Sequence, residues 1–89
     1  MEAKMYNYSS WIEETDPDAL RDLFRSKLVD AGFGVECVSE KHFIPFGYTA
    51  LFLLSESHFA IHTFPERNQT YIELSSCVKI PFDNFIRSL

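Results

Sequence analysis

The hydrophobic positions of this chain follow two different periods, and the longer period predicts one helix. Segment 17–31 carries apolar residues three or four positions apart, as one face of a helix requires. These residues are Leu20, Leu23, Phe24, Leu28 and Ala31. Thr15 or Asp16 is a suitable N-cap, and Pro17 suits the first helical turn. Gly32 and Gly34 supply the stop signal, so we expect a helix over residues 17–31.

Short apolar or alternating runs elsewhere in the chain predict five strands. They cover residues 4–11, 35–39 (with an extension to 43 left open), 48–54, 59–64 and 70–76. Turn residues at 45–47, a polar loop at 65–69 and a short final helix opening at 81–83 complete the chain. Strands joined by such short connections pair antiparallel. The sequence therefore predicts an α+β fold, a two-layer sandwich with two helices on one face of a mainly antiparallel sheet.

Composition and charge limit the classes of function. The 89 residues suffice for one domain, 1–89, with no repeat or linker. No apolar run approaches the roughly 20 residues of a membrane span, and we expect no secretory signal. A net charge of −5 argues against nucleic acid as a partner, because phosphates need a basic surface. The two cysteines, Cys37 and Cys77, are too few for a disulfide framework and predict free thiols and a cytoplasmic location.

The connection between the predicted strands 48–54 and 59–64 departs from ordinary turn chemistry. Tight turns favour Gly, Asn, Asp or Pro, whereas this one reads Ser-Glu-Ser-His at positions 55–58. Taken alone it is only a polar turn, and a lone strand histidine such as His62 is more typical of a structural residue. Three histidines and two scattered cysteines give no metal-ligand spacing. No glycine-rich phosphate loop occurs either.

Three segments at consistent spacing resemble the S-adenosylmethionine decarboxylases of bacteria and archaea. Residues 54–66, Leu-Ser-Glu-Ser-His-Phe-Ala-Ile-His-Thr-Phe-Pro-Glu, resemble that family's self-processing segment, with Phe64 where the family commonly has Trp. Residues 41–49 look like its His-x-Phe-x-Pro-x-Gly-x-Ser/Thr stretch, and residues 72–77 like its acidic-apolar-x-Thr-Cys strand. Val78 stands where the family usually has Gly. The resemblance implies a self-processing, pyruvoyl-dependent decarboxylase of S-adenosylmethionine that feeds polyamine (spermidine) synthesis.

The resemblance also implies roles for individual residues. The chain would be cut between Glu56 and Ser57, and Ser57 would become the pyruvoyl group. In this scheme Ser57 Oγ attacks the Glu56 carbonyl, Thr49 assists, and His62 moves protons. The pyruvoyl group then forms a Schiff base with the substrate amine and withdraws electrons as carbon dioxide leaves. Cys77 is the implied donor that protonates the substrate α-carbon afterwards.

Substrate recognition is implied for three further residues. Phe43 and Phe64 hold the places of two rings that sandwich adenine, and Glu66 holds that of a carboxylate that binds the ribose hydroxyls. Simple core packing is the competing explanation for both rings. Short bacterial members of the family are dimers, so a homodimer is expected, as a small aromatic-rich chain also suggests.

Two other functions remain open at this stage. One keeps the chemistry but changes the substrate to another amino acid, such as arginine or ornithine. The other is a non-enzymatic homologue, either a dead protomer or a regulatory partner, which Val78 and a C-terminus shorter than the family's favour. Self-cleavage separates the enzyme from the non-enzymatic homologue, and the substrate that releases carbon dioxide separates the two enzymes.

Overall fold

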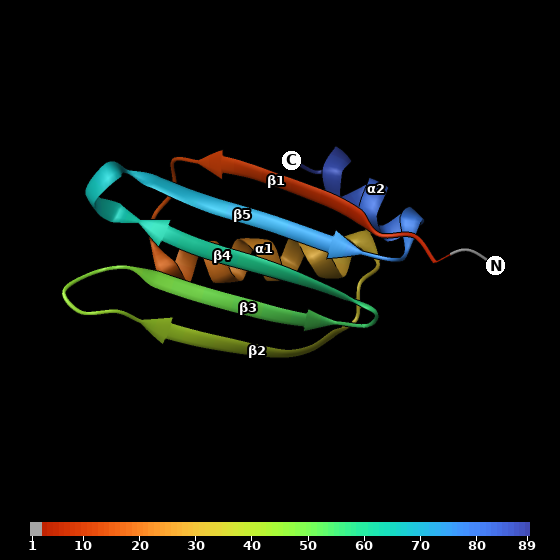
Figure 1. The fold of residues 1–89 in the computed structure, drawn as a ribbon, viewed down its shortest axis with the longest axis horizontal. Helices are drawn as coiled ribbons and strands as arrows, with labels where there is room; N and C mark the ends of the chain where they lie inside the picture. The colour runs from red at the N-terminus through yellow and green to blue at the C-terminus, as the bar shows by residue number, and fades with distance from the viewer. Residues whose placement is uncertain (1–2) are drawn as a thin grey trace.

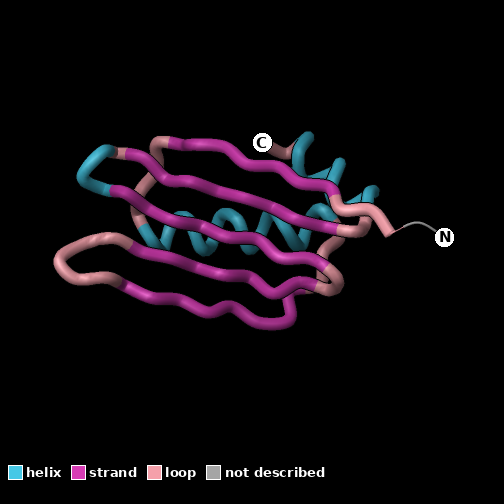
Figure 2. The backbone as a smooth tube through the Cα atoms, in the orientation of Figure 1, coloured by secondary structure: helices cyan, strands magenta, loops and turns pink. Residues whose placement is uncertain are grey.

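The computed structural model describes residues 3–89 and confirms the predicted α+β sandwich. One antiparallel sheet has the strand order β1-β5-β4-β3-β2, and both helices lie behind the same face of it (Figures 1 and 2). The strands are β1 (Tyr6–Ile12), β2 (Val35–His42), β3 (Tyr48–Leu54), β4 (Ser57–Phe64) and β5 (Gln69–Ser76). The helices are α1 (Pro17–Ala31), the 3-10 helix η1 (Pro65–Arg67) and α2 (Lys79–Arg87).

Helix α1 forms where the apolar spacing predicts it, and all but one of its predicted core residues are buried. The Asp16 side chain caps the helix by accepting a hydrogen bond from the Ala19 amide at 2.9 Å. Gly32 ends it with φ of 110°, a left-handed conformation that glycine adopts without strain. Four of the five predicted core positions are buried: Leu20, Phe24, Leu28 and Ala31. Leu23 is the exception, since it is 46% exposed at the edge of the apolar stripe.

The strands differ from the predicted ranges mainly at their ends. β2 extends to His42, and η1 forms within the predicted loop. β4 begins at Ser57 rather than at residue 59, because Ser57 pairs with Leu54 on β3 and with Ser76 on β5. Only Ser55 and Glu56 are left to form the β3–β4 turn. α2 begins at Lys79, two residues before the predicted start, since the first turn of a helix tolerates a proline.

The two faces of the sheet have different surroundings. Alternate residues of each strand point toward the helices and form the core, in which the Phe59 ring packs against Phe24, Phe52 and Phe85. We call the opposite side the open face, because neither helix covers it (Figure 1). Within residues 3–89, neither helix is long and apolar enough to cross a membrane.

Candidate functional site

The predicted site residues lie at opposite ends of the sheet. We call the end that carries the β3–β4 turn the turn end; it holds Glu56, Ser57, Ser76 and Cys77. We call the other end the loop end; its predicted residues are Phe43, Thr49, His62, Phe64 and Glu66. Ser57 and His62 are five residues apart on the regular strand β4, which separates their backbones by about 17 Å. One copy of the chain therefore does not bring these two residues together.

The backbone of the turn end is strained at the predicted cleavage position. Glu56 has a φ of 58°, in the left-handed region that is costly for a residue with a Cβ atom. The strain is held in place because the strands on both sides of this two-residue turn are fully paired. Such strain raises the energy of the uncut chain near the peptide bond that joins Glu56 to Ser57.

The Glu56 carbonyl faces two hydrogen-bond donors of one residue. The Cys77 amide donates to this oxygen at 3.4 Å, and the Cys77 thiol Sγ lies 3.2 Å from it. Donors aimed at a carbonyl oxygen stabilise the negative charge that develops when a nucleophile attacks its carbon. Cys77 is exposed with its thiol free, as is Cys37, which confirms the predicted free thiols.

The Ser57 hydroxyl is held by a residue that the sequence analysis did not single out. Ser57 Oγ donates to Ser76 Oγ at 2.7 Å, and both serines are buried. Ser76 Oγ in turn accepts from the Val78 amide at 3.0 Å and donates to the Val78 carbonyl at 3.2 Å. This arrangement draws the Ser57 proton toward Ser76 and leaves oxygen lone pairs for attack. The period of two along β5 could have indicated Ser76, because it places a hydroxyl at this position on the buried face with Ile72 and Leu74.

The loop end holds the histidine predicted to move protons. His62 Nδ1 lies 2.9 Å from Thr49 Oγ1, and the two residues are direct partners across β3 and β4. On its other side the imidazole stacks on Tyr71 of β5, with ring centroids 6.4 Å apart. Fixing one ring nitrogen orients the other, as proton transfer at a defined atom requires.

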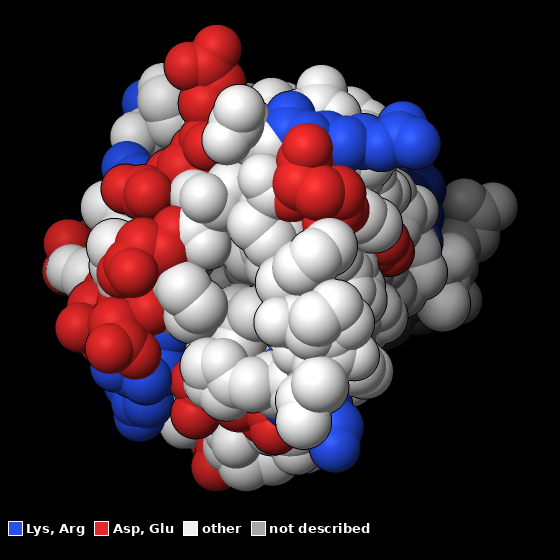
Figure 3. Space-filling model, turned by 90° about the vertical axis from the view of Figure 1, so that its left-hand side faces the viewer, with Lys and Arg blue, Asp and Glu red and all other residues white. Residues whose placement is uncertain are grey.

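Aromatic rings line a hollow beside this histidine. Its volume is about 270 Å³, and its lining comprises all five predicted loop-end residues together with Phe46, Gly47, Tyr48 and Thr63. Phe43 is 49% exposed and Phe64 40%, so simple core packing is the wrong explanation for these rings. Figure 3, which views the molecule from the loop end, shows a broad uncharged surface with acidic side chains gathered to one side.

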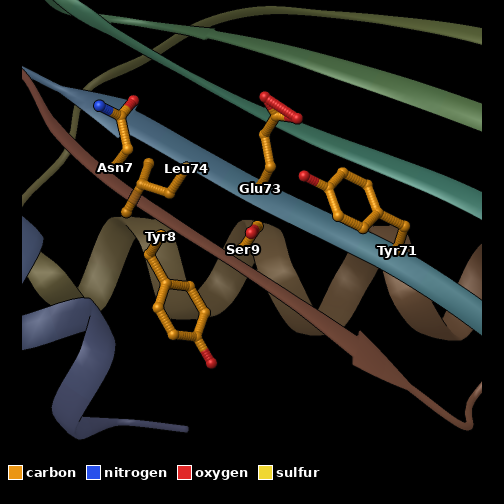
Figure 4. Close-up of a pocket in the computed structure, with 6 residues that line it drawn as sticks. All are labelled: Asn7, Tyr8, Ser9, Tyr71, Glu73 and Leu74. Atoms are coloured by element: carbon orange, nitrogen blue, oxygen red, sulfur yellow. The ribbon is translucent and has the colours of Figure 1, made fainter.

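A second, shallow hollow lies between β1 and β5. Its lining includes Asn7, Ser9, Tyr71 and Glu73, none of which the sequence analysis assigned. Figure 4 shows the hydroxyl end of Tyr71 directed along the strand toward Glu73. Among residues 3–89, no three His, Cys, Asp or Glu side chains gather closely enough to hold a metal ion.

Comparison with known proteins places the chain in a family. The family model for S-adenosylmethionine decarboxylase matches residues 5–89. The chain is 51% identical over 47 residues to S-adenosylmethionine decarboxylase proenzyme 2 of Bacillus cereus, a match that covers 53% of this chain and 38% of that protein. It is 39% identical over 66 residues to the S-adenosylmethionine decarboxylase proenzyme of Brevibacillus brevis, covering 67% of this chain and 50% of the relative.

A solved structure has the same fold. The crystal structure of the adenosylmethionine decarboxylase from Aquifex aeolicus matches with a TM-score of 0.73 and 21% sequence identity, covering 100% of this chain and 82% of that one. The matched part of the chain spans only 38 to 50% of the length of the two curated relatives described above. The match over residues 5–89 nevertheless shows that the chain belongs to the S-adenosylmethionine decarboxylase family.

Proposed function

We propose that this chain is a self-processing decarboxylase of S-adenosylmethionine, whose pyruvoyl group derives from Ser57 and whose product serves polyamine synthesis. The observation that carries the proposal is the turn end. There a strained Glu56 presents its carbonyl oxygen to the Cys77 amide and thiol, directly before a hydrogen-bonded Ser57 hydroxyl.

The turn-end residues supply the parts that backbone cleavage needs. Ser57 Oγ attacks the Glu56 carbonyl carbon, so a C–O bond forms and the C–N bond between the two residues breaks. The Cys77 amide stabilises the oxyanion that forms on the way. The Ser57 hydroxyl proton, directed to Ser76 Oγ, is replaced by an acyl group, and a proton goes to the departing Ser57 nitrogen. The product of this step is an ester, whose elimination gives the pyruvoyl group.

The surroundings of position 57 fit a group formed there. The pyruvoyl group supplies an electron-withdrawing carbonyl as carbon dioxide leaves the substrate. The Cys77 thiol, which lies 3.2 Å from the Glu56 oxygen, is close enough to the same turn to deliver a proton to the substrate α-carbon. Val78 has φ of −108° and ψ of 111°, an extended conformation without strain for a β-branched residue. The substitution of Gly by Val at this position therefore gives no support to a non-enzymatic homologue.

The loop end favours a nucleoside substrate over arginine or ornithine. Phe43 and Phe64 expose aromatic faces beside the hollow, where adenine can stack, and Glu66 can accept hydrogen bonds from ribose hydroxyls. Aromatic faces also attract a sulfonium cation. A simple amino acid would use neither feature.

A homodimer joins the two ends into one site. His62 lies on the open face at the loop end, and Cys77 is exposed at the turn end directly after β5; the open face also exposes Leu51 and Leu53. Two copies packed open face to open face in opposite directions set the turn end of each copy against the loop end of the other. A two-fold axis then creates two equivalent sites from one kind of contact. In this arrangement the partner's His62 approaches the β3–β4 turn and the Glu56–Ser57 peptide from the open face, while the Ser57 hydroxyl stays on the helix-covered face with Ser76.

Complementation between two variants tests both the backbone cut and whether two chains contribute residues to one site. We expect Ser57→Ala to remain one uncut chain and His62→Ala to be cut slowly or to stop at the ester, by intact mass. When the two variants are refolded together, the chain that carries His62→Ala should be cut, because the Ser57→Ala partner supplies an intact His62. His58→Ala is a matched control on the same face of β4 and should be cut normally.

Two outcomes contradict the proposal at different points. If the mixture stays uncut while wild-type protein is cut, the site lies within one chain and the dimer is wrong. If wild-type protein keeps its full mass after prolonged incubation with and without hydroxylamine, which cleaves an ester but not an amide, self-processing is wrong. The C-terminal product of the cut should begin with a pyruvoyl group at position 57. It should therefore resist Edman sequencing, because a pyruvoyl group has no free amine.

A further inference from the structure

A row of side chains crosses the open face at the loop end. Trp11 on β1 pairs with Tyr71 on β5. Tyr71 in turn pairs with His62 on β4, and His62 pairs with Thr49 on β3. Contacts follow this register: the Trp11 and Tyr71 ring centroids are 5.3 Å apart, and Tyr71 stacks on His62. The edge strand β1 is thereby connected to the hollow, although none of its residues lines it.

Trp11 also contacts Phe64 directly. The two ring centroids are 5.7 Å apart at an interplanar angle of 47°. The indole is the single tryptophan of the chain and is 55% exposed, so the core does not require it. Phe64 lies on β4, between the hollow on its β3 side and Trp11 on its β1 side. The indole therefore fills the space into which the Phe64 ring would otherwise turn away from the hollow.

A half-exposed phenyl ring near the end of a strand has several side-chain rotamers available. A neighbouring ring that occupies one of these directions limits the choice, and less entropy is then lost when a ligand stacks on the phenyl face. Tilted aromatic pairs of this kind contribute about 0.5–1.5 kcal/mol beyond the area that they bury. This physical effect makes Trp11 relevant to ligand binding without any contact between the indole and the ligand.

We propose that Trp11 is a positioning residue that holds the Phe64 ring toward the hollow for stacking on the purine of an adenine nucleoside. The inference rests on the proposed function, because it presumes that the hollow binds such a nucleoside. It goes beyond the family resemblance, which assigns Phe64 but no residue of β1. Trp11 sets the orientation of the recognition ring, and Phe64 makes the contact.

A double-mutant cycle on the full chain tests this dependence. The probe is 5′-methylthioadenosine, a nucleoside thioether with no carboxylate to lose, and its affinity is measured by calorimetry. We expect Trp11→Ala to weaken binding about 3- to 10-fold, in keeping with the strength of an aromatic pair. Trp11→Phe should restore most of the affinity, because a phenyl ring fills part of the same space. In a Phe64→Ala background, Trp11→Ala should cause no further loss.

Val29→Ala is the matched control, since Val29 is as exposed as Trp11 but lies on α1, away from the open face, and should leave the affinity unchanged. Equal losses from Trp11→Ala in both backgrounds would overturn the inference, because Trp11 would then act independently of Phe64. Wild-type binding that Trp11→Ala leaves unchanged would overturn this inference alone and leave the proposed function standing. Absence of binding by wild-type protein would overturn the nucleoside substrate and this inference with it.

Discussion

The two ends of the sheet solve different physical problems with different kinds of residue. At the turn end, small side chains and backbone groups hydrogen bond around one carbonyl, with Ser57 Oγ 2.7 Å from Ser76 Oγ. At the loop end, large aromatic rings surround a hollow of about 270 Å³. Breaking a bond requires short, fixed distances, whereas recognising a nucleoside requires exposed aromatic area. The proposed cleavage position and the proposed recognition rings therefore lie at separate ends of one sheet, whereas His62, the proposed proton carrier, lies at the recognition end.

The packing and pairing of β4 keep the turn end and the loop end of the sheet at a fixed separation. Phe59 lies midway along β4, is fully buried, and packs against rings from α1, β3 and α2. The backbone of β4 is extended and paired with strands on both sides, which fixes its rise at about 3.3 Å per residue. The separation of Ser57 from His62 is therefore a property of the fold, and the proposed homodimer would close it without a change in the shape of either copy.

The largest effect that distinguishes the two ends is expected at Cys77. Cys77→Ser keeps the backbone amide that faces the Glu56 carbonyl, so the cut after Glu56 should persist. Decarboxylation should fall by about 10²- to 10⁴-fold and give misdirected protonation, because a hydroxyl is a much weaker proton donor than a thiol. Intact mass reports the cut, and release of carbon dioxide from S-adenosylmethionine reports turnover.

Cys37→Ser provides the control for this prediction. Cys37 is the other exposed thiol and lies on β2, so its loss should change neither the cut nor the turnover. A fully active Cys77→Ser protein would remove the thiol from the mechanism.

Features set by neighbours in the sequence were predictable, and features set by strand pairing were not. The Asp16 cap and the Gly32 stop of α1 are local, so the helix was predicted with its correct bounds. The two-layer architecture followed from short connections in the same way. By contrast, the hydrogen bond from Ser57 to Ser76 depends on the register of β4 against β5, which sequence spacing does not encode.

The roles of the candidate site residues stay predictions, and the geometry in which the fold places these residues was not foreseen from the sequence. The family resemblance selected residues on both ends of the sheet without indicating that β4 holds them about 17 Å apart. Exposure of Phe43 and Phe64 was also beyond the sequence, because an aromatic residue gives the same pattern in a core as in a binding site. The positive φ of Glu56 was unforeseen for a related reason: the paired strands around a two-residue turn impose it.

Phe64→Ala should produce the next largest effect and should leave the turn end untouched. Loss of one stacking ring should weaken binding of S-adenosylmethionine by roughly 1–3 kcal/mol, the scale of base stacking on an aromatic side chain. The cut after Glu56 should proceed, since Phe64 belongs to recognition. Calorimetry gives the affinity, and intact mass gives the extent of cutting.

Ile44→Ala is a suitable control for Phe64→Ala. Ile44 is the most exposed large hydrophobic residue of the described chain and lies at the tip of the β2–β3 loop, outside the lining of the hollow. Its loss should leave the affinity unchanged. Unchanged affinity in a folded Phe64→Ala protein would contradict the recognition role of the loop end.

The smallest predicted effect concerns a polar contact at the loop end that we assign to stability alone. The Tyr48 hydroxyl donates to the Glu40 carboxylate at 2.5 Å, and Arg21 of α1 reaches the same carboxylate at 3.4 Å. The hydrogen bond from Tyr48 is the main cause that holds the pKa of Glu40 below its ordinary value. Burial, followed by this hydrogen bond, raises the pKa of Tyr48.

Tyr48→Phe tests this assignment through the pH dependence of unfolding. A carboxylate with a lowered pKa in the folded state adds stability above its unfolded pKa, and this stability is lost as the pH falls through the folded pKa. We expect Tyr48→Phe to reduce the free energy of unfolding by about 1 kcal/mol at neutral pH and by less near pH 3, so that its acid-side slope is flatter. Urea unfolding at several pH values measures both the free energy and its slope with pH. Tyr8→Phe, at a partly buried tyrosine packed against the core, should keep the wild-type slope. Parallel curves for Tyr48→Phe and wild type would mean that Glu40 does not depend on this hydrogen bond. Neither substitution should alter the cut after Glu56, because neither tyrosine hydroxyl forms a hydrogen bond with the turn-end residues or with His62.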